Sequence, residues 1–355
     1  TSFLLKDENG KEHSIFTGDT LFLGDVGIPD VAQRYKGVSK EELAGTLYDS
    51  VNDRIKPLPD DILVYPAHGA GSACGKNMMK ETVDTLKNQK QINYAINGSY
   101  SKEEFVKKLT DNLPEPPSYF PFNVKLNQQG YEDLSEIIKK SKNPLSVSQF
   151  ESMANEDNIK IIDVRHQDIF AAGHVPNSIF IGLDGGFAPW VGAVLSNIDQ
   201  PILLVADEDR VEEAITRLSR VGFDNVKGYL NGGFSAWINE GKEVALIDTI
   251  SANDFENNYQ GNDVNIFDVR KLTEYQSEHV LDAINIPLNN INNFISDFEI
   301  DGENYIHCAA GYRSMIANSI LKAHGIHNLV DVRGGFSSIK KTAITTSEYI
   351  CPSTL

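Results

Sequence analysis

The sequence predicts an α/β protein of three domains, of which the last two each contain a parallel sheet covered by helices. Three observations support this fold class. The chain has 355 residues, enough for two or three domains with separate cores. One pattern occurs twice in the second half, at a spacing of just over one hundred residues. Within each copy, apolar strand-like runs alternate with stretches of helical period, which is typical of parallel sheets with crossover helices.

The first domain is expected over residues 1–142. Proline is frequent in its segment 113–121, which is therefore predicted to be an extended strap that closes the domain. A polar, helix-like stretch follows at 131–142 and ends the domain. The earlier elements are predicted strands at 2–5, 14–16 and 62–65, with a helix at 40–52.

The two copies of the repeat are expected over residues 143–246 and 247–355. Each copy has an Asp-Val-Arg strand end, then a His-Val pair, and finally Gly-Gly-Phe. The matching segments are 161–165 with 266–270, 174–175 with 279–280, and 232–234 with 334–336. Helices are predicted at 211–221 in the first copy and 314–323 in the second.

Composition and charge argue against several classes of function. Fifty acidic and 32 basic residues give a net charge of -18, which repels nucleic acids and anionic lipid surfaces. No apolar run approaches the roughly 18 residues of a membrane span. Three cysteines are too few for a disulfide framework and indicate reduced thiols in the cytoplasm. The first residues contain no signal peptide, and because residue 1 is not methionine, we expect a processed or truncated chain.

Cys308 is the candidate nucleophile of the third domain. It follows a predicted strand at 304–307 and precedes a helix that is predicted from about Ser314. In such a short loop, successive backbone N–H groups can turn inward around the sulfur. These amides, the positive helix end and the guanidinium of Arg313 are expected to favour the thiolate, which is the form that attacks sulfur. The predicted cradle for a persulfide consists of Ala309, Ala310, Gly311, Tyr312 and Ser314.

The run Cys-Ala-Ala-Gly-Tyr-Arg-Ser, with the Asp-Val-Arg strand before it and Gly-Gly-Phe after it, resembles the rhodanese family of sulfurtransferases. The resemblance covers residues 247 to the C-terminus and implies that Cys308 accepts a sulfane sulfur as a persulfide and passes it to a thiophilic acceptor. A cysteine phosphatase is one alternative. That class has a loop one residue longer than the four residues between Cys308 and Arg313, and the shorter loop suits a single sulfur atom. The other alternative is an inert buried cysteine. Cys351 is interpreted as an inert tail thiol or, alternatively, a sulfur relay.

The first copy keeps the pattern but lacks the nucleophile. It contains no cysteine, and its equivalent loop at 206–210 carries three consecutive carboxylates. Because carboxylates would repel thiolates and sulfur oxyanions, we expect a catalytically inactive rhodanese-like domain with a structural or interactive role.

Several residues that both copies share invite catalytic interpretations. We instead expect them to fix strand ends and loops through hydrogen bonds and ion pairs. These residues are Asp163, Arg165 and His174 in the first copy and Asp268, Arg270 and His279 in the second. Phe187 and Trp190 are expected to lie at an interface between domains.

The first domain carries an aspartate and a histidine just after predicted strands, at Asp19 and His68, and converging oxygen and nitrogen ligands suit a hard or borderline metal. The motifs Thr-Gly-Asp-Thr-Leu-Phe and Pro-Ala-His-Gly around them resemble the second half of the metallo-β-lactamase fold, and more narrowly its persulfide dioxygenase branch, over residues 1 to about 127. In that branch the aspartate matching Asp19 completes a two-histidine, one-carboxylate iron site, and the histidine matching His68 lies beside it. Cys74 is expected near this pocket, either as a persulfide acceptor or as a plain thiol.

The histidine motif that supplies the other ligands in that branch is absent from the sequence, and His13 is not expected to replace it. The resemblance implies Fe(II) in the intact protein. This chain supplies one good ligand, so we expect it to lack the dioxygenase step unless further residues precede it. Ile28 stands where relatives often carry arginine, which puts a glutathione-like substrate in doubt.

The domain order resembles bacterial persulfide dioxygenase–sulfurtransferase fusions, which detoxify sulfide-derived persulfides. The resemblance implies low-molecular-weight thiols and persulfides as partners, with sulfite and thiosulfate as products. Two alternatives remain open: a glyoxalase-II-like metal-dependent thioesterase fused to a rhodanese, and a non-enzymatic scaffold that presents the C-terminal sulfurtransferase. A cytoplasmic protein without nucleic-acid or membrane partners is expected, and a homo-oligomer is left open.

Overall fold

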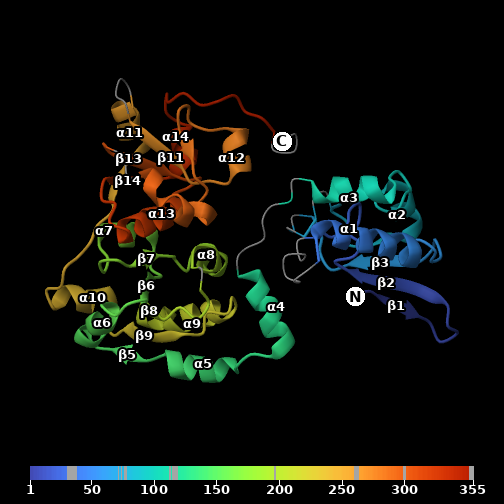
Figure 1. Ribbon diagram of the computed structural model, residues 1–355, viewed down its shortest axis with the longest axis horizontal. Coiled ribbons are helices and arrows are strands. Elements are labelled where there is room, and N and C mark those ends of the chain that lie inside the picture. Colours follow the sequence, from blue (N-terminus) through green and yellow to red (C-terminus); the bar gives the residue numbers. More distant parts are fainter. Residues whose placement is uncertain are drawn as a thin grey trace. The chain divides into compact units, whose positions relative to one another are not determined.

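The computed structural model describes residues 1–29, 38–70, 72, 74–75, 78–111, 113, 119–195, 197–259, 264–298 and 301–351 (Figure 1). The chain divides into two compact units, Thr1–Pro116 and Pro117–Leu355. The predicted boundary at residue 142 is therefore not the place where the compact units divide.

The first unit contains a mixed four-stranded sheet in the order β1-β2-β3-β4. The outer pairs are antiparallel and the central pair β2/β3 is parallel. Its strands are β1 (Phe3–Lys6), β2 (Glu12–Gly18), β3 (Leu63–Pro66) and β4 (Asp84–Thr85). Its helices are α1 (Lys40–Asp49), the π-helical turn η2 (Ser50–Ile55), α2 (Leu86–Ile92) and α3 (Lys102–Thr110). The predicted strands and the helix from residue 40 are confirmed.

The sheet of the first unit buries one face under helices. Ile15 and Val64 point into a core that includes Phe105 of α3. Phe3 and Phe16 on the opposite face are 68% and 46% exposed, so the alternation along the strands separates a buried face from an apolar exposed one.

The second unit contains two five-stranded sheets of identical topology, in which every strand pair is parallel. The first sheet has the order β5 (Pro144–Leu145), β9 (Val226–Leu230), β8 (Ile202–Val205), β6 (Lys160–Asp163) and β7 (Ile179–Phe180). The second has the order β10 (Asp248–Ile250), β14 (Leu329–Val332), β13 (Asn304–His307), β11 (Asn265–Asp268) and β12 (Ile284–Asn285). The internal repeat and the predicted α/β class with parallel sheets are confirmed.

The helices of the first repeat, with the two that precede it, are α4 (Phe120–Gln129), α5 (Leu134–Ser141), α6 (Val147–Ala154), α7 (Gln167–Ala172), α8 (Phe187–Val194), η3 (Glu208–Arg210), α9 (Val211–Ser219) and α10 (Gly233–Asn239). Helix α5 contributes Ile137 to the core that surrounds α9, so α5 belongs with the repeat rather than with the first unit. Residues 114–118 of the predicted strap lie outside the described residues. Its last residues, 120–121, are helical instead of extended.

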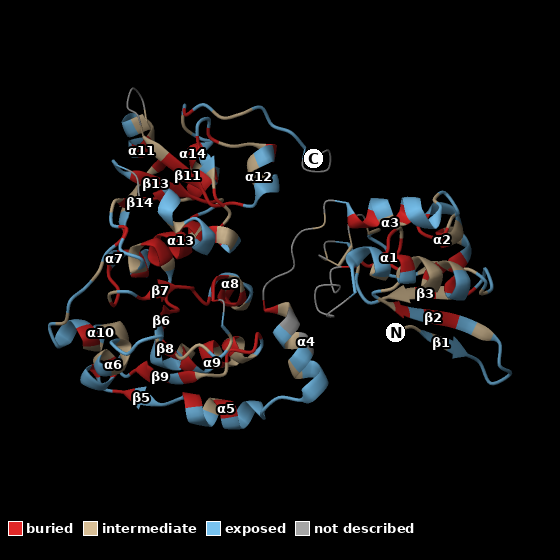
Figure 2. Ribbon diagram, viewed as in Figure 1, coloured by how far each residue is buried: buried red, intermediate tan, exposed pale blue. Residues whose placement is uncertain are grey.

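The helices of the second repeat are α11 (Ala252–Tyr259), α12 (Leu272–Ser277), η4 (Leu288–Asn293), η5 (Ile295–Phe298), α13 (Tyr312–Ala323) and α14 (Gly335–Ile339). Helix α13 begins at Tyr312, slightly before the predicted start, and eight of its twelve residues are buried. Figure 2 shows α13 and the neighbouring strands largely in the colour of buried residues.

One hydrophobic core extends across both repeats. It joins Phe187 and Val191 of α8 to Ile291 of η4 and Ile316 of α13. Trp190 is partly buried against the same core. The predicted interface role of Phe187 and Trp190 is confirmed, because α8 packs directly on η4 of the other repeat.

The repeated Asp-Val-Arg strand ends are held by buried ion pairs. Arg165 donates through Nε and Nη2 to both carboxylate oxygens of Asp163 and also to the Gly173 carbonyl. Arg270 makes the same bonds to Asp268 and to the Glu278 carbonyl. Each guanidinium also lies over the phenylalanine of its Gly-Gly-Phe motif, at 4.3 Å and 4.0 Å from the ring centroid. The structural role predicted for these residues is thereby confirmed.

The repeated histidines stabilise the turns that follow α7 and α12. Nδ1 of His174 is 2.9 Å from the Phe170 carbonyl, and Nδ1 of His279 is 2.8 Å from the Tyr275 carbonyl. Burial lowers the pKa of His174 to about 4, so this ring is neutral at physiological pH.

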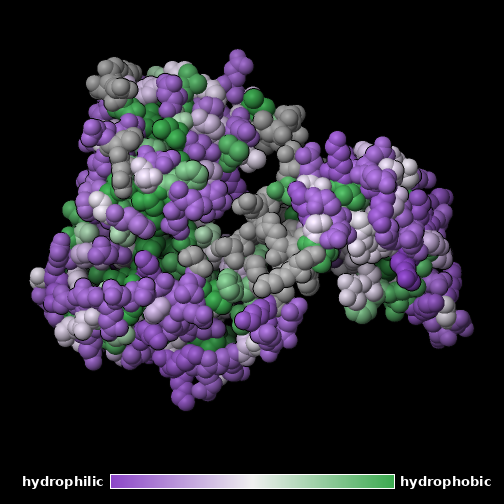
Figure 3. Space-filling model, in the orientation of Figure 1, coloured by the Kyte–Doolittle hydropathy of each residue, from purple (hydrophilic) through white to green (hydrophobic). Residues whose placement is uncertain are grey.

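None of the described helices combines the length and the apolar character needed to cross a membrane. On the face shown in Figure 3, hydrophilic residues cover much of the surface of each unit.

Candidate functional site: a cysteine loop and a metal-ligand cluster

Cys308 follows β13 directly, where the strand gives way to the loop that leads into α13. The backbone N–H of Gly311 donates a hydrogen bond to its sulfur over 3.1 Å. Gly311 has a φ of 103°, a conformation that favours glycine because it has no Cβ. The loop therefore places one amide and the N-terminus of α13 next to the sulfur, as the sequence predicts. Gly311 is the one amide for which the described structure shows a bond to the sulfur.

The Gly-Gly-Phe motif holds this loop through backbone hydrogen bonds. The Phe336 amide donates to the Cys308 carbonyl over 2.7 Å, and the Ser337 amide donates to the Ala309 carbonyl over 3.0 Å. A Cβ on Gly335 would lie 2.4 Å from the Cys308 carbonyl oxygen. Only glycine fits there, which explains why this motif accompanies the cysteine loop.

Arg313 lies in the first turn of α13, and its guanidinium is paired with a carboxylate. Its Nη1 and Nη2 donate to the carboxylate of Glu274 on α12, over 2.6 Å and 2.8 Å. Hydrogen bonding to Glu274 raises the pKa of the Arg313 guanidinium. Burial raises the pKa of the Glu274 carboxyl, but the hydrogen bond and the charge of Arg313 outweigh burial, so this pKa is lowered on balance. Glu274, which the sequence analysis missed, thus orients the cation that was predicted to favour the thiolate.

The side chain of Tyr312 turns away from the sulfur. Its hydroxyl donates to the Gly182 carbonyl of the first repeat over 2.7 Å, and burial raises the pKa of the phenol. Of the predicted cradle residues, Tyr312 therefore contributes backbone to the loop and a side chain to the contact between repeats.

A buried polar group lies beneath the start of α13. Ser314 donates through Oγ to the Gly311 carbonyl, and Asn318 donates through Nδ2 to the Ser314 carbonyl and, over 3.3 Å, to Asp331 on β14. Burial raises the pKa of Asp331 to about 7. The sequence analysis did not identify Asp331, and the one signal available was a carboxylate inside an apolar strand.

His307, which precedes the nucleophile, is fully buried, and burial lowers its pKa. Its Nδ1 is 3.4 Å from the Cys308 carbonyl. The ring before the nucleophile is therefore neutral rather than charged.

The equivalent loop of the first repeat begins at Ala206, which occupies the position of Cys308 after β8. A Cβ on Gly233 would lie 3.2 Å from the Ala206 carbonyl, so the motif approaches the loop as Gly335 does in the second repeat. In place of an amide cradle, Arg210 forms ion pairs with Asp184 and Glu213. Because residue 206 is alanine, the first repeat has no thiol at this position.

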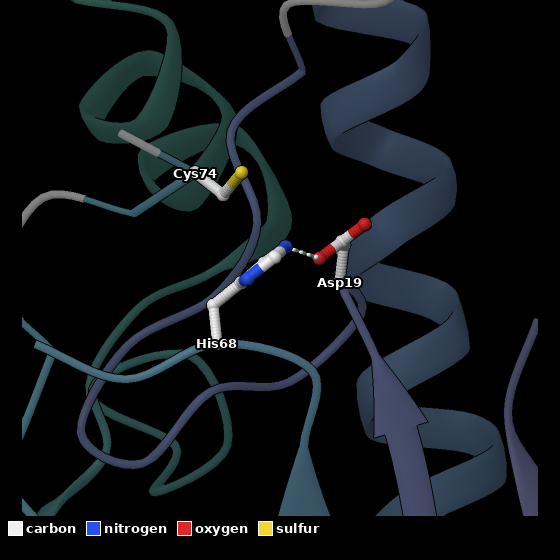
Figure 4. A group of neighbouring side chains, drawn as sticks. All are labelled: Asp19, His68 and Cys74. Atoms are coloured by element: carbon white, nitrogen blue, oxygen red, sulfur yellow. Dashed lines mark ion pairs between the residues drawn. The ribbon is translucent and has the colours of Figure 1, made fainter. Parts of the chain in front are cut away.

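The first unit brings three candidate metal ligands together. Asp19 follows β2, His68 follows β3, and Cys74 lies in the loop beyond it; one donor atom of each lies within 4.8 Å of the other two (Figure 4). Nε2 of His68 is 3.3 Å from Oδ1 of Asp19. A Cβ on Gly27 would lie 2.0 Å from the Asp19 carbonyl, so the loop after β2 folds back tightly at this site.

The donor set is chemically suited to a metal ion. A carboxylate oxygen, an imidazole nitrogen and a thiol sulfur are ligands of borderline ions such as Fe(II) and Zn(II). The sequence analysis expected Asp19 as a ligand with His68 and Cys74 near it, and the described structure brings donor atoms of all three together.

Comparison with known proteins identifies both parts of the chain. The model of the rhodanese-like domain matches residues 146–240 and 251–342, which together make up more than half of the chain. Human mitochondrial persulfide dioxygenase ETHE1 is 37% identical over 117 residues, which cover 32% of this chain and 37% of that protein. Thiosulfate sulfurtransferase GlpE of Shewanella oneidensis is 31% identical over 94 residues, covering 26% of this chain and 89% of that protein.

Among solved structures, a metallo-β-lactamase from Staphylococcus aureus is similar at 32% identity, with a TM-score of 0.49, covering 65% of this chain and 62% of that one. The chain spans little more than a third of the length of its persulfide dioxygenase relatives. The N-terminal region is thus similar in sequence to part of ETHE1, and it precedes two tandem rhodanese-like domains. With both of its C-terminal domains matched, this chain belongs to the rhodanese-like family.

Proposed function

We propose that Cys308 carries a sulfane sulfur as a persulfide and transfers it to a thiol or to another thiophilic acceptor. With thiosulfate as donor, the thiolate attacks the outer sulfur, a bond to Cys308 forms, and sulfite leaves with the electron pair of the broken sulfur–sulfur bond. The acceptor then takes the outer sulfur, and Cys308 leaves as a thiolate. The observation that carries this proposal is the Gly311 N–H that donates to the Cys308 sulfur at the N-terminus of α13.

Thiosulfate:cyanide sulfurtransfer tests this assignment. Cys308→Ser should abolish turnover and the persulfide mass on the peptide that contains residue 308, because oxygen is a poor sulfur carrier. Cys351→Ser changes an exposed thiol and is the matched control that should keep activity. Undiminished sulfurtransfer in the Cys308 variant would reject the proposal.

For the N-terminal region, we propose oxidation of a low-molecular-weight persulfide to sulfite at mononuclear Fe(II) in the intact protein, with thiosulfate as the combined product. Asp19 would be a ligand of the iron, and His68 and Cys74 would lie beside it or join it. The iron, when bound, would supply the redox chemistry with oxygen. The support is the cluster of three donor atoms and the similarity to persulfide dioxygenases over part of the chain.

Metal binding tests the site without requiring turnover. Anaerobic equilibrium dialysis with Fe(II) should show binding that Asp19→Ala weakens. Asp61→Ala, which changes an exposed aspartate of the same unit, should leave binding intact. If both variants bind iron like the parent chain, Asp19 is not a ligand.

The contact between His68 and Asp19 also favours a second candidate, a glyoxalase-II-like thioesterase, because that branch uses two metals and needs this histidine as a ligand. A metal count on the full-length protein separates the two candidates: one iron supports the dioxygenase, and two metals per chain support the thioesterase. A scaffold without N-terminal activity would consume no oxygen with glutathione persulfide.

A further inference from the structure

The contact between Tyr312 and the first repeat connects the inactive repeat to the cysteine loop. Tyr312 follows Gly311 directly, and the amide of Gly311 is the group that donates to the Cys308 sulfur. Gly311 itself has no side chain that could hold its position. Two neighbouring side chains hold this part of the loop. Ser314 donates to the Gly311 carbonyl from within the second repeat, whereas the Tyr312 side chain reaches the other repeat.

Three contacts hold the Tyr312 ring. Its hydroxyl donates to the Gly182 carbonyl over 2.7 Å. The ring lies so close to Gly185 that a Cβ at this position would be 2.3 Å from ring atoms. The Phe180 ring packs edge-to-face against it, with centroids 5.5 Å apart and an interplanar angle of 70°. All three partners belong to the segment of the first repeat that runs from Phe180, the last residue of β7, to the start of α8.

A second contact fixes the same helix further along. The Phe180 amide donates to Oγ of Ser319, over 3.0 Å, in the buried part of α13. The first repeat thus bonds α13 at the cysteine loop through Tyr312, about two turns further along through Ser319, and near its end through Lys322, whose Nζ donates to the Leu246 carbonyl over 2.6 Å. Only the first of these points can act directly on the sulfur.

We infer that the first repeat positions the sulfur cradle of the second through Tyr312, which makes Tyr312 a positioning residue for sulfur transfer. The inference rests on the proposed role of Cys308. Loss of the Gly182 bond, or displacement of the ring by a side chain at Gly185, would shift the Gly311 N–H from the sulfur and disfavour the thiolate.

Two variants test this inference from opposite sides. Tyr312→Phe removes the hydroxyl and adds no atom. Gly185→Ala leaves the sequence of the second repeat unchanged and places a methyl group against the Tyr312 ring, which must shift. The backbone at Gly185 is not in the left-handed region, so the backbone itself accepts alanine. Gly186→Ala, one residue along, and Ser319→Ala, which removes the bond that the Phe180 amide makes further along α13, are the matched controls.

The readout is the rate at which iodoacetamide alkylates Cys308 near pH 7, divided by the plateau rate at high pH. This ratio cancels changes in access to the buried sulfur and reports the thiolate fraction. Both test variants should lower the ratio, and with it the rate of thiosulfate:cyanide transfer, by roughly two- to tenfold, the rate equivalent of one lost hydrogen bond. Ser319→Ala should lower the melting temperature but leave the ratio unchanged, which separates positioning from general stability.

An unchanged ratio in Tyr312→Phe overturns the inference, even if Gly185→Ala fails to fold. A ratio that falls equally in Ser319→Ala also overturns it, because the effect would then be a general loosening of the interface. If the parent protein never takes up sulfur from thiosulfate, the proposed function fails instead, and the alkylation ratio still measures whether Tyr312 positions the loop.

Discussion

Single residues around Cys308 differ in how far the sequence reveals them. Cys308, Gly311 and Arg313 form one contiguous motif, so the candidate nucleophile and its loop can be predicted from residue types and spacing. Glu274 pairs with Arg313 across 39 residues, and Gly182 accepts from Tyr312 across 130. Such partners are brought together by the tertiary fold, and no local pattern identifies them.

The buried carboxyl of Asp331 should make stability depend on pH. It keeps its proton up to about pH 7 in the native state, whereas an unperturbed aspartate has a pKa of 3.8. Between these values the native state binds more protons than the unfolded state, so the free energy of unfolding falls as pH rises through this window.

Asp331→Asn removes this titration. Urea unfolding at about pH 5 and pH 8 should show a smaller loss of stability with rising pH in the variant than in the parent. Asp301→Asn, at an exposed position, is the control and should follow the parent. Equal losses in the parent and the Asp331 variant would contradict the prediction.

At the scale of secondary structure, the elements with explicit local signals were predicted best. Helix α1 starts at Lys40 because Ser39 and Glu42 form a capping box. The end of the predicted strap is the first turn of α4 instead. Proline is tolerated there, because the N–H groups of the first turn have no intrahelical partner to lose.

The buried ion pairs at the ends of β6 and β11 should dominate the stability of these elements. Asp163→Asn leaves the Arg165 guanidinium buried without its counter-charge and should lower the free energy of unfolding by about 3–5 kcal/mol. Glu212→Gln breaks an exposed pair with Lys142 and should cost about 1 kcal/mol or less. Urea titrations of both variants measure the contrast, and similar losses would show that the strand-end pair is not structural.

At the scale of the whole molecule, the sequence revealed the two repeats but not their common core. Periodicity predicts which face of a strand or helix is buried, but it does not identify the element that covers this face. The core that joins α8, η4 and α13 therefore became visible only in the structure.

The compact unit from residue 117 to the C-terminus should fold and work alone. It contains both repeats with their shared core, so a fragment 117–355 should keep the thiosulfate:cyanide activity proposed for Cys308 within about twofold of the full chain. A fragment that starts at residue 143 lacks α5 and its core residue Ile137, and it should melt at a lower temperature. An unstable or inactive 117–355 fragment would show that the first unit is needed for folding.

The common core also limits what can be excised from this chain. Removing the first repeat would expose an apolar side of α13 to solvent, because this helix buries two thirds of its residues. A minimal biocatalyst trimmed to residues 247–355 would therefore tend to aggregate, and its designer would first have to resurface that helix with polar side chains.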